Sequence, residues 1–579
     1  MQLSRSFALL AIYTTLALAK VDSLVSERAL QKRFVDANGN YNVTIVHTND
    51  VHAHLDQWRA GRGTDCTPGS ECISGYARIK QKVSELRQSI QDPIFLNAGD
   101  EFQGTLFFTY YGGEKISYAI NEVGYDVFTL GNHEFDRGQG ELAAFLKNLT
   151  FPVVCANFKT NDTAMNALNI QPYTIIEKHQ LGIIGVITPD TKGTSSGAGP
   201  GTEFSDPVQA VQKAVDELQA KNITRIIALT HIGYDKDIEL AQKTKGVDLI
   251  VGGHSHTLLG NFTNAMGSYP TTAKNLDGEE VFIVTSYRWG EILGKMNIAF
   301  DASGKIVSYE GEPLRLTNTT QQDPKLQAEV NEWRQPFDAM AQVVVGTSSV
   351  VLDQSICQFS ECTLGNVITD AMYEYRKNAG GNVDFALINS GGIRASISEG
   401  TVTQGDILTS FPFMNGVVDL TWTGKQLLDI FEGVVSKYST LSHHATTSFI
   451  QVSKQVKFSW NPNNVNQTRL ITLEIGGQQV DVNKNYTMVT LDFLASNGDY
   501  LWGTRTDFAA LDTLDVVLAS YFKAHSPVGA SIEGRITNST STTQQLPGKG
   551  SSGGSGGASA LIVSGLSAGM MLLAGMMLV

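Results

Sequence analysis

The sequence from residue 43 to residue 52 reads Val-Thr-Ile-Val-His-Thr-Asn-Asp-Val-His, an apolar run that ends in Asp50 and His52. Short apolar runs bounded by glycine or polar residues are typical of buried strands. Four more runs of this kind follow, and each leads into residues that can bind a metal ion. The five runs occupy residues 43–46, 94–96, 127–130, 226–229 and 249–251.

The residues that follow these runs are rich in carboxylate and imidazole groups. In open α/β sheets the residues just past the carboxyl ends of the strands line the binding crevice, so five such strands would bring these groups to one edge. Carboxylate and imidazole suit Zn, Mn or Fe, and a bridging carboxylate allows two ions to lie together. Each motif alone is more typical of a turn, but the ordered series favours a dinuclear metal site. The residues are Asp50, His52, Asp100, Asn132, His133, Glu134, His231, His254 and His256.

The order Asp-x-His, Gly-Asp, Gly-Asn-His-Glu, His, Gly-His-x-His resembles that of the calcineurin-like metallophosphoesterases. The longer strings at residues 48–52, 97–100, 131–136 and 252–256 resemble those of the 5′-nucleotidase family, which includes ecto-5′-nucleotidases and bacterial periplasmic UDP-sugar hydrolases. The resemblance extends over residues 41 to 535. It implies an α/β protein with an amino-terminal metallophosphoesterase β-sandwich flanked by helices, followed by a carboxyl-terminal α/β 5′-nucleotidase domain.

The resemblance also implies a set of metal ligands and a catalytic pair. Two divalent ions are expected, zinc first, with Mn, Co and Mg as alternatives. His133, paired with Asp136, would stabilise the developing charge or protonate the departing oxygen. His54 is expected to lie behind the ligands or to be exposed. One ion would be held by Asp50, His52 and His256, the other by Asn132, His231 and His254, and Asp100 would bridge them.

The second half of the chain would recognise the substrate. The segment from Asn389 to Arg394 resembles the Asn-Gly-Gly-Gly-Ile-Arg loop of the family, with Ser390 in place of a glycine. Arg394 offers a fork for phosphate or ribose oxygens. Phe413 and Phe493 match the two aromatic residues that sandwich the base, although core packing is the simpler interpretation without the resemblance.

Two further positions bear on the substrate. Asp499 would accept hydrogen bonds from the ribose hydroxyls. The ecto-5′-nucleotidases carry an arginine directly after the first cysteine of the pair that matches Cys357 and Cys362, and here that residue is Gln358. Glutamine carries no charge, so its contact with an anionic substrate should be weaker.

The resemblance therefore implies hydrolysis of nucleoside 5′-monophosphates to nucleosides and phosphate. Three alternatives stay open: an apyrase-like or UDP-sugar diphosphohydrolase, a cyclic nucleotide phosphodiesterase, and an inactive surface protein that binds nucleosides. The net charge of −14 argues against nucleic acid as a partner. Whether the protein forms a homodimer is left open.

A chain of 579 residues exceeds one hydrophobic core, and 42% hydrophobic with 17% charged residues describes a globular protein. Alternating apolar runs and longer segments predict an α/β unit over residues 41–320. Residues 321–340 have helical spacing and are predicted to bridge the domains. The nucleotide-binding domain is expected over residues 341–537, with helices at 365–377 and 424–435 and a strand at 383–388.

Both ends have the composition of processing signals. Residues 1–19 read as a secretory signal peptide, and residues 20–40 as a linker or pro-segment that contains the dibasic Lys32-Arg33. Residues 538–559 form a Ser/Thr/Gly-rich spacer with the expected attachment site of a glycosylphosphatidylinositol (GPI) anchor, and the apolar tail 560–579 would be removed. A tail-anchored transmembrane helix is the alternative. We expect a secreted protein anchored on the extracellular face of the plasma membrane.

Cysteines and glycosylation sequons agree with secretion. Cys66 with Cys72, and Cys357 with Cys362, are close enough in sequence to clip short loops, and Cys155 reads as a buried free thiol. Asn42 is expected to be shielded because it opens the first strand. The nine sequons begin at Asn42, Asn148, Asn161, Asn222, Asn261, Asn318, Asn466, Asn485 and Asn538.

Overall fold

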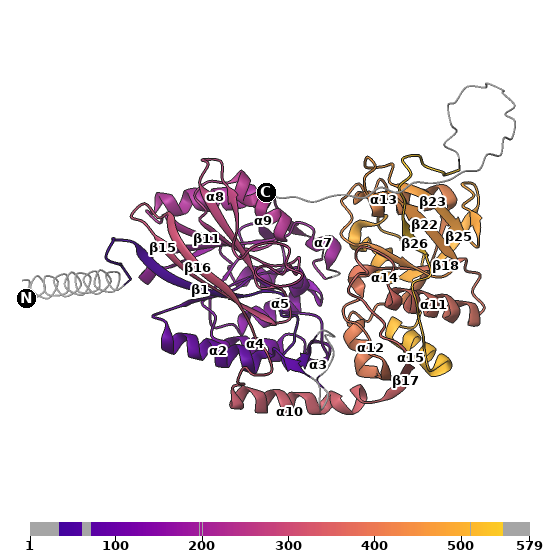
Figure 1. The fold of residues 1–579 in the computed structure, drawn as a ribbon, viewed down its shortest axis with the longest axis horizontal. Helices are drawn as coiled ribbons and strands as arrows, with labels where there is room; N and C mark the ends of the chain where they lie inside the picture. Colours follow the sequence, from indigo (N-terminus) through magenta and orange to yellow (C-terminus); the bar gives the residue numbers. More distant parts are fainter. Residues whose placement is uncertain are drawn as a thin grey trace, which may run out of the picture.

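The computed structural model describes residues 34–60, 66, 71–195, 197–199, 201–509 and 511–547. In this part of the chain two α/β domains are joined by the helix α10 (Pro324–Ala341) (Figure 1). The predicted signal peptide, most of the predicted linker, much of the spacer and the apolar tail lie outside the described residues. Among the described helices, none is both long enough and apolar enough to cross a bilayer.

The amino-terminal domain is a sandwich of two six-stranded sheets. In the first sheet the order is β16 (Ile306–Arg315), β15 (Ile292–Phe300), β1 (Tyr41–Thr48), β4 (Ile94–Asn97), β5 (Val127–Thr129) and β6 (Val153–Val154). In the second sheet it is β13 (Thr271–Lys274), β14 (Glu280–Thr285), β12 (Leu249–Gly252), β11 (Arg225–His231), β9 (Leu181–Ile187) and β8 (Tyr173–Ile176).

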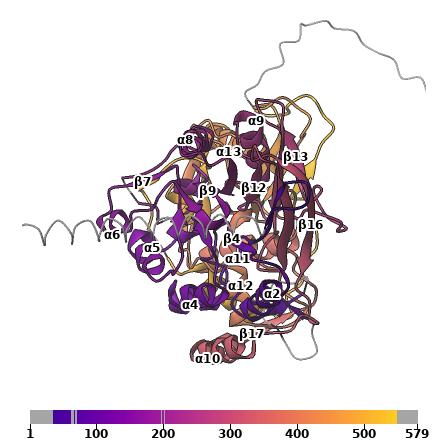
Figure 2. The ribbon, with the colours of Figure 1, turned by 90° about the vertical axis from the view of Figure 1, so that its left-hand side faces the viewer.

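Helices cover the outer faces of this sandwich. Figure 2 shows α8 (Pro207–Ala220) and α9 (Tyr234–Lys243) on one side of the strands, and α2 (Tyr76–Ser89) and α4 (Glu114–Val123) on the other. Between the sheets lies a core of aliphatic side chains from both, including Ile45, Leu96, Ile183, Leu229 and Val251. The central strands β4, β5, β11 and β12 are thus buried on two faces, which explains why they read as continuous apolar runs.

The five predicted strands are present, but they divide between the two sheets. β1, β4 and β5 belong to the first sheet, and β11 and β12 belong to the second. The expectation of one sheet edge is therefore wrong in that respect. Their carboxyl ends still meet at the same end of the sandwich, where Nδ1 of His231 after β11 lies 2.7 Å from the carbonyl oxygen of Ala98 after β4.

The bridging helix α10 begins where the sequence indicates. The Asp323 side chain accepts a hydrogen bond from the Leu326 amide and Pro324 takes the first helical turn, a combination that favours a helix start. The helix buries Leu326, Val330 and Phe337. It contacts α2 and α3 (Leu106–Tyr111) of the first domain and α12 (Gln404–Ser410) of the second. A helix is thus present where the spacing of residues 321–340 predicted one, with bounds Pro324–Ala341.

The carboxyl-terminal domain contains two four-stranded sheets. One has the order β20 (Val417–Thr423), β25 (Asn485–Leu491), β18 (Phe385–Asn389) and β21 (Ile450–Val452), and the other β24 (Gln478–Gln479), β23 (Leu470–Ile475), β22 (Val456–Trp460) and β26 (Ile536–Asn538). The predicted helices and strand appear as α11 (Thr363–Asn378), α13 (Gly424–Ser436) and β18. A short pair, β17 (Val344–Ser348) with β19 (Gly400–Thr403), and α15 (Leu514–His525) complete the domain.

The cysteines behave as predicted, and one sequon does not. Cys66 is bonded to Cys72 and Cys357 to Cys362, while Cys155 is a free, buried thiol. Asn42 is exposed, because the cover over its face of the sheet, which buries Thr44, Val46 and Thr48, does not extend to this end of β1. The expectation that this asparagine is shielded is wrong.

Candidate metal centre

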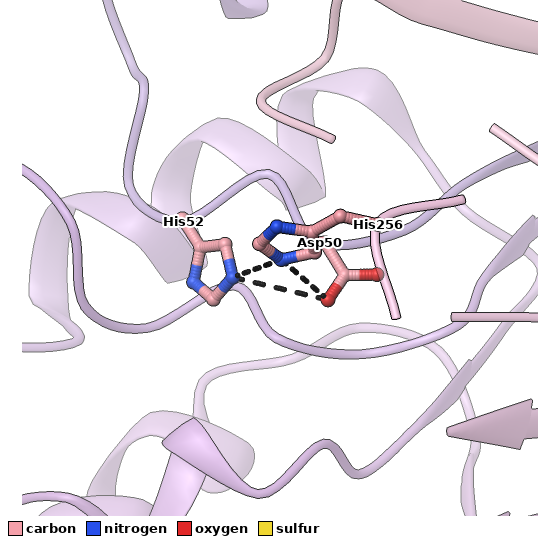
Figure 3. Close-up of side chains that lie close together, drawn as sticks. All are labelled: Asp50, His52 and His256. Atoms are coloured by element: carbon pink, nitrogen blue, oxygen red, sulfur yellow. Dashed lines mark hydrogen bonds and ion pairs between the residues drawn. The ribbon is translucent and has the colours of Figure 1, made fainter. Parts of the chain in front are cut away.

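Two groups of side chains gather at the carboxyl ends of the strands. Asp50, His52 and His256 form one group, whose ligand atoms all lie within 4.8 Å of one another. In that group Nε2 of His256 lies 3.0 Å from Nε2 of His52 and 3.2 Å from Oδ1 of Asp50 (Figure 3). The other group consists of Asp100, His231 and His254.

Two of the histidines are fixed in the tautomer that a metal ligand requires. Nδ1 of His52 lies 2.9 Å from the carbonyl oxygen of Phe102, and Nδ1 of His231 faces the carbonyl of Ala98. A carbonyl oxygen only accepts, so both Nδ1 atoms carry the proton and both Nε2 atoms present a lone pair. The backbone thus prepares these two imidazoles for a cation.

The carboxylates are also oriented by neighbouring donors. Oδ2 of Asp50 accepts hydrogen bonds from the Asn49 side chain (2.7 Å) and the His254 amide (2.9 Å). Oδ1 of Asp100 accepts one from the His133 amide (2.9 Å). The other oxygen of Asp100 lies 3.0 Å from Nε2 of His231 and 3.8 Å from Nε2 of His52. This oxygen therefore lies between the two groups, where a bridging ligand would be needed.

Three of the candidate ligand atoms are buried with few or no partners. Oδ1 of Asn132 has no hydrogen-bond partner, whereas Oδ1 of Asp50 and Nε2 of His231 have only another candidate ligand within reach, Nε2 of His256 and Oδ2 of Asp100. A buried lone pair without a partner is costly, and a cation would satisfy all three. The donor set of carboxylate, amide and imidazole suits zinc, manganese or cobalt. The residues present therefore fit a pair of divalent ions.

Electrostatics in the centre favour positive charge. Burial alone would raise the pKa values of Asp50 and Asp100, but the surrounding imidazoles, His231 among them, hold both below the usual range. Burial alone would likewise lower the pKa of His231, yet the two carboxylates raise it to about 10. A metal ion would compete with a proton for the same lone pair.

The backbone that carries the ligands is strained. Asp50, His52, Asp100, His254 and His256 have φ values between 49° and 82°, a region that non-glycine residues rarely adopt. Such strain persists only where the surroundings impose it, and it is concentrated at functional sites.

Glu134 is one group that imposes this geometry, and the sequence analysis assigned it no separate role. Its buried carboxylate accepts hydrogen bonds from the amides of Gly131 (2.6 Å), Asp100 (3.0 Å) and Glu101 (2.7 Å). It therefore ties the loop after β5 to the loop after β4. The signal in the sequence was an acidic residue inside an otherwise apolar and metal-binding motif.

His133 and Asp136 form a pair beside the ligands. Nδ1 of His133 lies 2.8 Å from Oδ2 of Asp136, across one turn of the 3₁₀ helix η1 (His133–Phe135). Burial opposes the charged imidazole, but the carboxylates of Asp136 and Asp100 outweigh it and raise the pKa of His133. The pair can therefore hold a proton at the Nε2 side, as a general acid requires.

Arg394 and Phe413 of the second domain contact two histidines of the first domain, His52 among the candidate ligands and His133 beside them. Nη2 of Arg394 lies 3.3 Å from Nε2 of His52. The Phe413 ring has its centre 5.8 Å from that of His133 and 5.7 Å from Cζ of Arg394. The predicted substrate loop and the predicted metal ligands are thus brought together.

The other residues that were predicted to bind the substrate also lie in the carboxyl-terminal domain, where they make contacts within that domain. Nδ2 of Asn389 donates to Oδ2 of Asp499 (2.7 Å), and Oδ1 of Asn389 is buried without a partner. Oε1 of Gln358 accepts a hydrogen bond from the Phe449 amide (3.2 Å). The ring of Phe493 is half-buried against the core of the domain, and in the described part of the chain it makes no ring contact with Phe413.

His54 lies behind the ligands, the first of its two predicted positions. The side chain is buried rather than exposed, and its Nδ1 lies 2.9 Å from the carbonyl oxygens of both Val51 and His52. Its ring stacks on Trp289, with 4.9 Å between ring centres. His54 therefore supports the loop that carries His52 and is not itself placed among the ligands.

Arg288 supplies a positive charge near the same centre. Its guanidinium carbon lies 3.9 Å from the centre of the Trp289 ring. Burial lowers the pKa values of His256 and Arg394, and the charge of Arg288 lowers them further. Sequence reasoning missed Arg288, because a single arginine after a strand carries no motif.

Family models match both halves of the chain. Residues 43–258 match the calcineurin-like phosphoesterase model, and residues 344–504 match the 5′-nucleotidase carboxyl-terminal domain. The chain is 34% identical to the 5′-nucleotidase of Bos taurus over 86% of its own length and 91% of the relative. The chain belongs to the 5′-nucleotidase family. It is therefore a phosphoric monoester hydrolase.

Other members of the family agree in sequence and in structure. The chain is 34% identical to the snake venom 5′-nucleotidase of Naja atra, covering 86% of this chain and 99% of that one. The crystal structure of a 5′-nucleotidase precursor from Thermus thermophilus matches with a TM-score of 0.79 at 35% identity, over 86% of this chain and all of that chain (100%). Both domains of the 5′-nucleotidase fold are thus present.

Proposed function

We propose that the protein is a secreted, metal-dependent 5′-nucleotidase that hydrolyses nucleoside 5′-monophosphates to nucleoside and phosphate. One observation carries the proposal. Two groups of candidate metal ligands lie together at one end of the sandwich, and Arg394 and Phe413 of the other domain contact His52 of one group and the neighbouring His133. A phosphate ester between the domains would meet cations on one side and a guanidinium and an aromatic ring on the other.

We assign the metal ligands as the sequence suggests. Asp50, His52 and His256 would hold one ion, Asn132, His231 and His254 the other, and Asp100 would bridge. The position of Oδ2 of Asp100 between the two groups supports the bridge. Two divalent ions, with zinc as the first choice, would supply positive charge that neutralises phosphate oxygens. The same charge would lower the pKa of a water molecule, so that it loses a proton and can attack phosphorus.

The catalytic acid in this proposal is His133. Its Nδ1 atom is engaged by Asp136, so the proton at Nε2 is the one available to the departing 5′ oxygen. Arg394 would hold the phosphate by its planar fork. Asp136 fixes the orientation of the imidazole and stabilises its positive charge before transfer.

The nucleoside would be recognised by the carboxyl-terminal domain. We infer that Asp499 and Asn389 bind the ribose hydroxyls, and that Phe413 and Phe493 stack on the base. Stacking of a base on an aromatic ring contributes about 1–3 kcal/mol and tolerates different bases. Gln358 would offer its uncharged amide at the wall of this site.

We also propose the location that the ends of the chain suggest. Residues 1–19 would direct secretion, and a GPI anchor attached within residues 538–559 would hold the enzyme on the extracellular face of the membrane. Nucleotides outside the cell would then be its substrates. Homodimer formation remains open in this proposal.

Gln358 favours a second candidate, a diphosphohydrolase acting on ADP, ATP or UDP-sugars. An uncharged residue at this wall weakens the hold on a monophosphate, and the Arg288 guanidinium supplies another positive charge near the centre. The reaction at the metal ions would be the same. Only the substrate profile separates the two candidates.

The deciding experiment is phosphate release from AMP, ADP, ATP, UDP-glucose and 2′,3′-cyclic AMP, with and without chelator. We expect AMP to be preferred, chelator to abolish release, and Zn, Mn or Co to restore it. Preference for ADP, ATP or UDP-glucose would replace the first candidate by the second. Release from none of them, with metal added back, would leave an inactive nucleoside-binding protein.

Metal analysis supplies the control. The wild-type protein should retain close to two equivalents of metal, and His254→Ala should retain less and lose activity. His525→Ala, at an exposed histidine of α15, should match the wild type. Equal metal content in all three proteins would contradict the ligand assignment.

A further inference from the structure

Tyr500 of the carboxyl-terminal domain packs directly on Gly193 of the amino-terminal domain. Tyr500 ends the 3₁₀ helix η4 (Gly498–Tyr500), and Gly193 lies in the short helix α7 (Thr191–Thr194). A methyl group at Gly193 would collide with Cε2 and Cζ of the tyrosine ring. Only glycine leaves room for this contact. Figure 1 shows α7 on the side of its domain that faces the other domain.

The tyrosine is held rigidly by its own domain. Its ring stacks on His444 with 4.7 Å between ring centres and 13° between the planes. The Ser442 hydroxyl donates to the Tyr500 carbonyl oxygen (2.6 Å), and the Ser439 hydroxyl to that of Leu501 (2.8 Å). Tyr500 is 7% exposed. The Ser/Thr-rich segment 439–447, which carried no predicted function, therefore braces this turn.

The braced turn includes Asp499, the predicted ribose ligand. Asp499 and Tyr500 both have left-handed backbones, with φ values of 52° and 54°, so the turn depends on its surroundings. Oδ1 of Asp499 accepts a hydrogen bond from Thr447 (2.6 Å), and Oδ2 accepts one from Asn389 (2.7 Å). The carboxylate of Asp499 and the ring of Tyr500 thus belong to one turn, and both are held by residues of segment 439–447.

On the other side of the contact, the segment that carries α7 packs on the turn of the catalytic histidine. A methyl group at Gly197 would collide with the carbonyl oxygen of Phe135, the last residue of η1. α7 itself also contacts both η1 and η4. A continuous path of packed residues therefore leads from His133 through α7 and Tyr500 to Asp499.

We propose that Tyr500 is a positioning residue. Its contact with Gly193 sets the distance between the metal centre, which binds the phosphate, and the residues of the carboxyl-terminal domain that bind the nucleoside. The inference rests on the proposed function and deepens it. The contact between Tyr500 and Gly193 matters only for substrates that bind both the metal centre and the nucleoside-binding residues. A small ester such as p-nitrophenyl phosphate needs the metal centre alone and should be indifferent to it.

The test is a double-mutant cycle with Gly193→Ala, Tyr500→Ala and the double variant. We expect Gly193→Ala to lower kcat/KM for AMP at least tenfold while p-nitrophenyl phosphate hydrolysis stays within twofold of the wild type. When the Tyr500 ring is removed, the methyl group added at residue 193 no longer collides with it. The double variant should therefore resemble Tyr500→Ala and not show the product of the two losses.

Two matched controls accompany the cycle. Tyr500→Phe keeps the ring and should retain most of the activity on AMP. Gly140→Ala, at a glycine with no atom within 4 Å of the added methyl group, should match the wild type. Losses that multiply in the double variant, or equal losses on AMP and p-nitrophenyl phosphate, would overturn the inference.

Hydrogen exchange gives a readout that needs no substrate. Amide protection at residues 190–195 and 498–502 should fall in Gly193→Ala and Tyr500→Ala, and should be unchanged in Tyr500→Phe. Unchanged amide protection in all variants would contradict the contact between Tyr500 and Gly193. If the wild-type protein is inactive on AMP but the variants show these changes in amide protection, the proposed function would be overturned and the contact between Tyr500 and Gly193 would be supported.

Discussion

At the scale of single residues, burial fixes which side chains carry charge. His47 in β1 is fully buried, with Nε2 2.8 Å from the hydroxyl of Tyr269. A methyl group at Gly294 of the neighbouring strand would collide with that nitrogen, so the imidazole fills the space of the missing side chain. Burial lowers the pKa of His47 to about 3, and the folded protein therefore keeps it neutral.

This histidine makes stability depend on pH. Its pKa is about 6.5 in the unfolded chain and about 3 in the folded one, so its contribution is present above pH 6.5 and is lost as pH falls towards 3. At pH 5 the loss is about 2 kcal/mol. We expect the Tm advantage of the wild type over His47→Gln to be smaller at pH 5 than at pH 7.5.

Thermal melts at the two pH values check this prediction. His443→Gln, at an exposed position, serves as the matched control and should keep a constant Tm difference from the wild type. A difference between the wild type and His47→Gln that does not change with pH would mean that His47 does not titrate as its burial requires.

At the scale of elements, the disulfide loop is held by side chains from the strand β21 and from the 3₁₀ helix η3 (Ser390–Gly392). Gln451 of β21 is fully buried; its Nε2 donates to the carbonyls of Cys357 and Ser360 (both 2.8 Å), and its Oε1 accepts from the Cys362 amide (3.1 Å). The Ser390 hydroxyl, where the family has glycine, donates to the same Cys357 carbonyl (2.6 Å). The disulfide alone therefore does not define the loop.

We predict that Gln451→Leu destabilises the protein although the disulfide stays intact. Leucine fills a similar volume but leaves buried backbone groups unpaired, at a cost of about 2–4 kcal/mol in the free energy of unfolding. Because Gln358 lies in this loop, KM for AMP should rise as well. Denaturant titration and steady-state kinetics measure the two effects. Gln479→Leu, on the exposed strand β24, is the control. The prediction would be wrong if Gln451→Leu had the same Tm as the wild type.

At the scale of the whole molecule, the functional site is divided between two domains connected by α10. Contacts such as Arg394 with His52 and Tyr500 with Gly193 bring the halves together. Long helices that carry a domain can accommodate rotation at their ends. We propose that one domain rotates against the other to admit substrate and release product.

Small-angle scattering tests this rotation. A saturating, non-hydrolysable nucleotide should bridge both halves and shift the wild-type profile towards a more compact particle. Gly193→Ala should be less compact than the wild type under the same conditions. Profiles that stay identical with and without the nucleotide would count against the rotation.

Much of this fold could be predicted because burial leaves a pattern in the chain. The strands β1, β4, β5, β11 and β12 were recognised because strands covered on both faces are continuously apolar. The helix α10 was recognised from its spacing and its first turn. The apolar runs alone did not show that these strands divide between two sheets, since the same run suits either sheet; only the resemblance to the family implied a β-sandwich.

The candidate site shows the same limit. The types and order of the ligands, from Asp50 to His256, are written in the sequence and predict a dinuclear centre. The roles of Arg288 and Gln451 are not, because each acts on groups that are far away along the chain and leaves no local pattern. Glu134 is visible in its motif, but its hydrogen bonds to the loop after β4 are known only from the structure. The exposure of Asn42 was also mispredicted, since one outward residue in an apolar run cannot be identified before the neighbouring strands are known.

The sequence by itself determined the ligand chemistry, the family and the order of the elements, because residue type and spacing carry them directly. Only the tertiary structure decided which Nδ1 atoms are protonated, which oxygen of Asp100 faces both ligand groups, and which glycine receives Tyr500. The physical reason is distance: hydrogen bonds, burial and steric contact act over a few ångströms in space, between residues that are hundreds of positions apart.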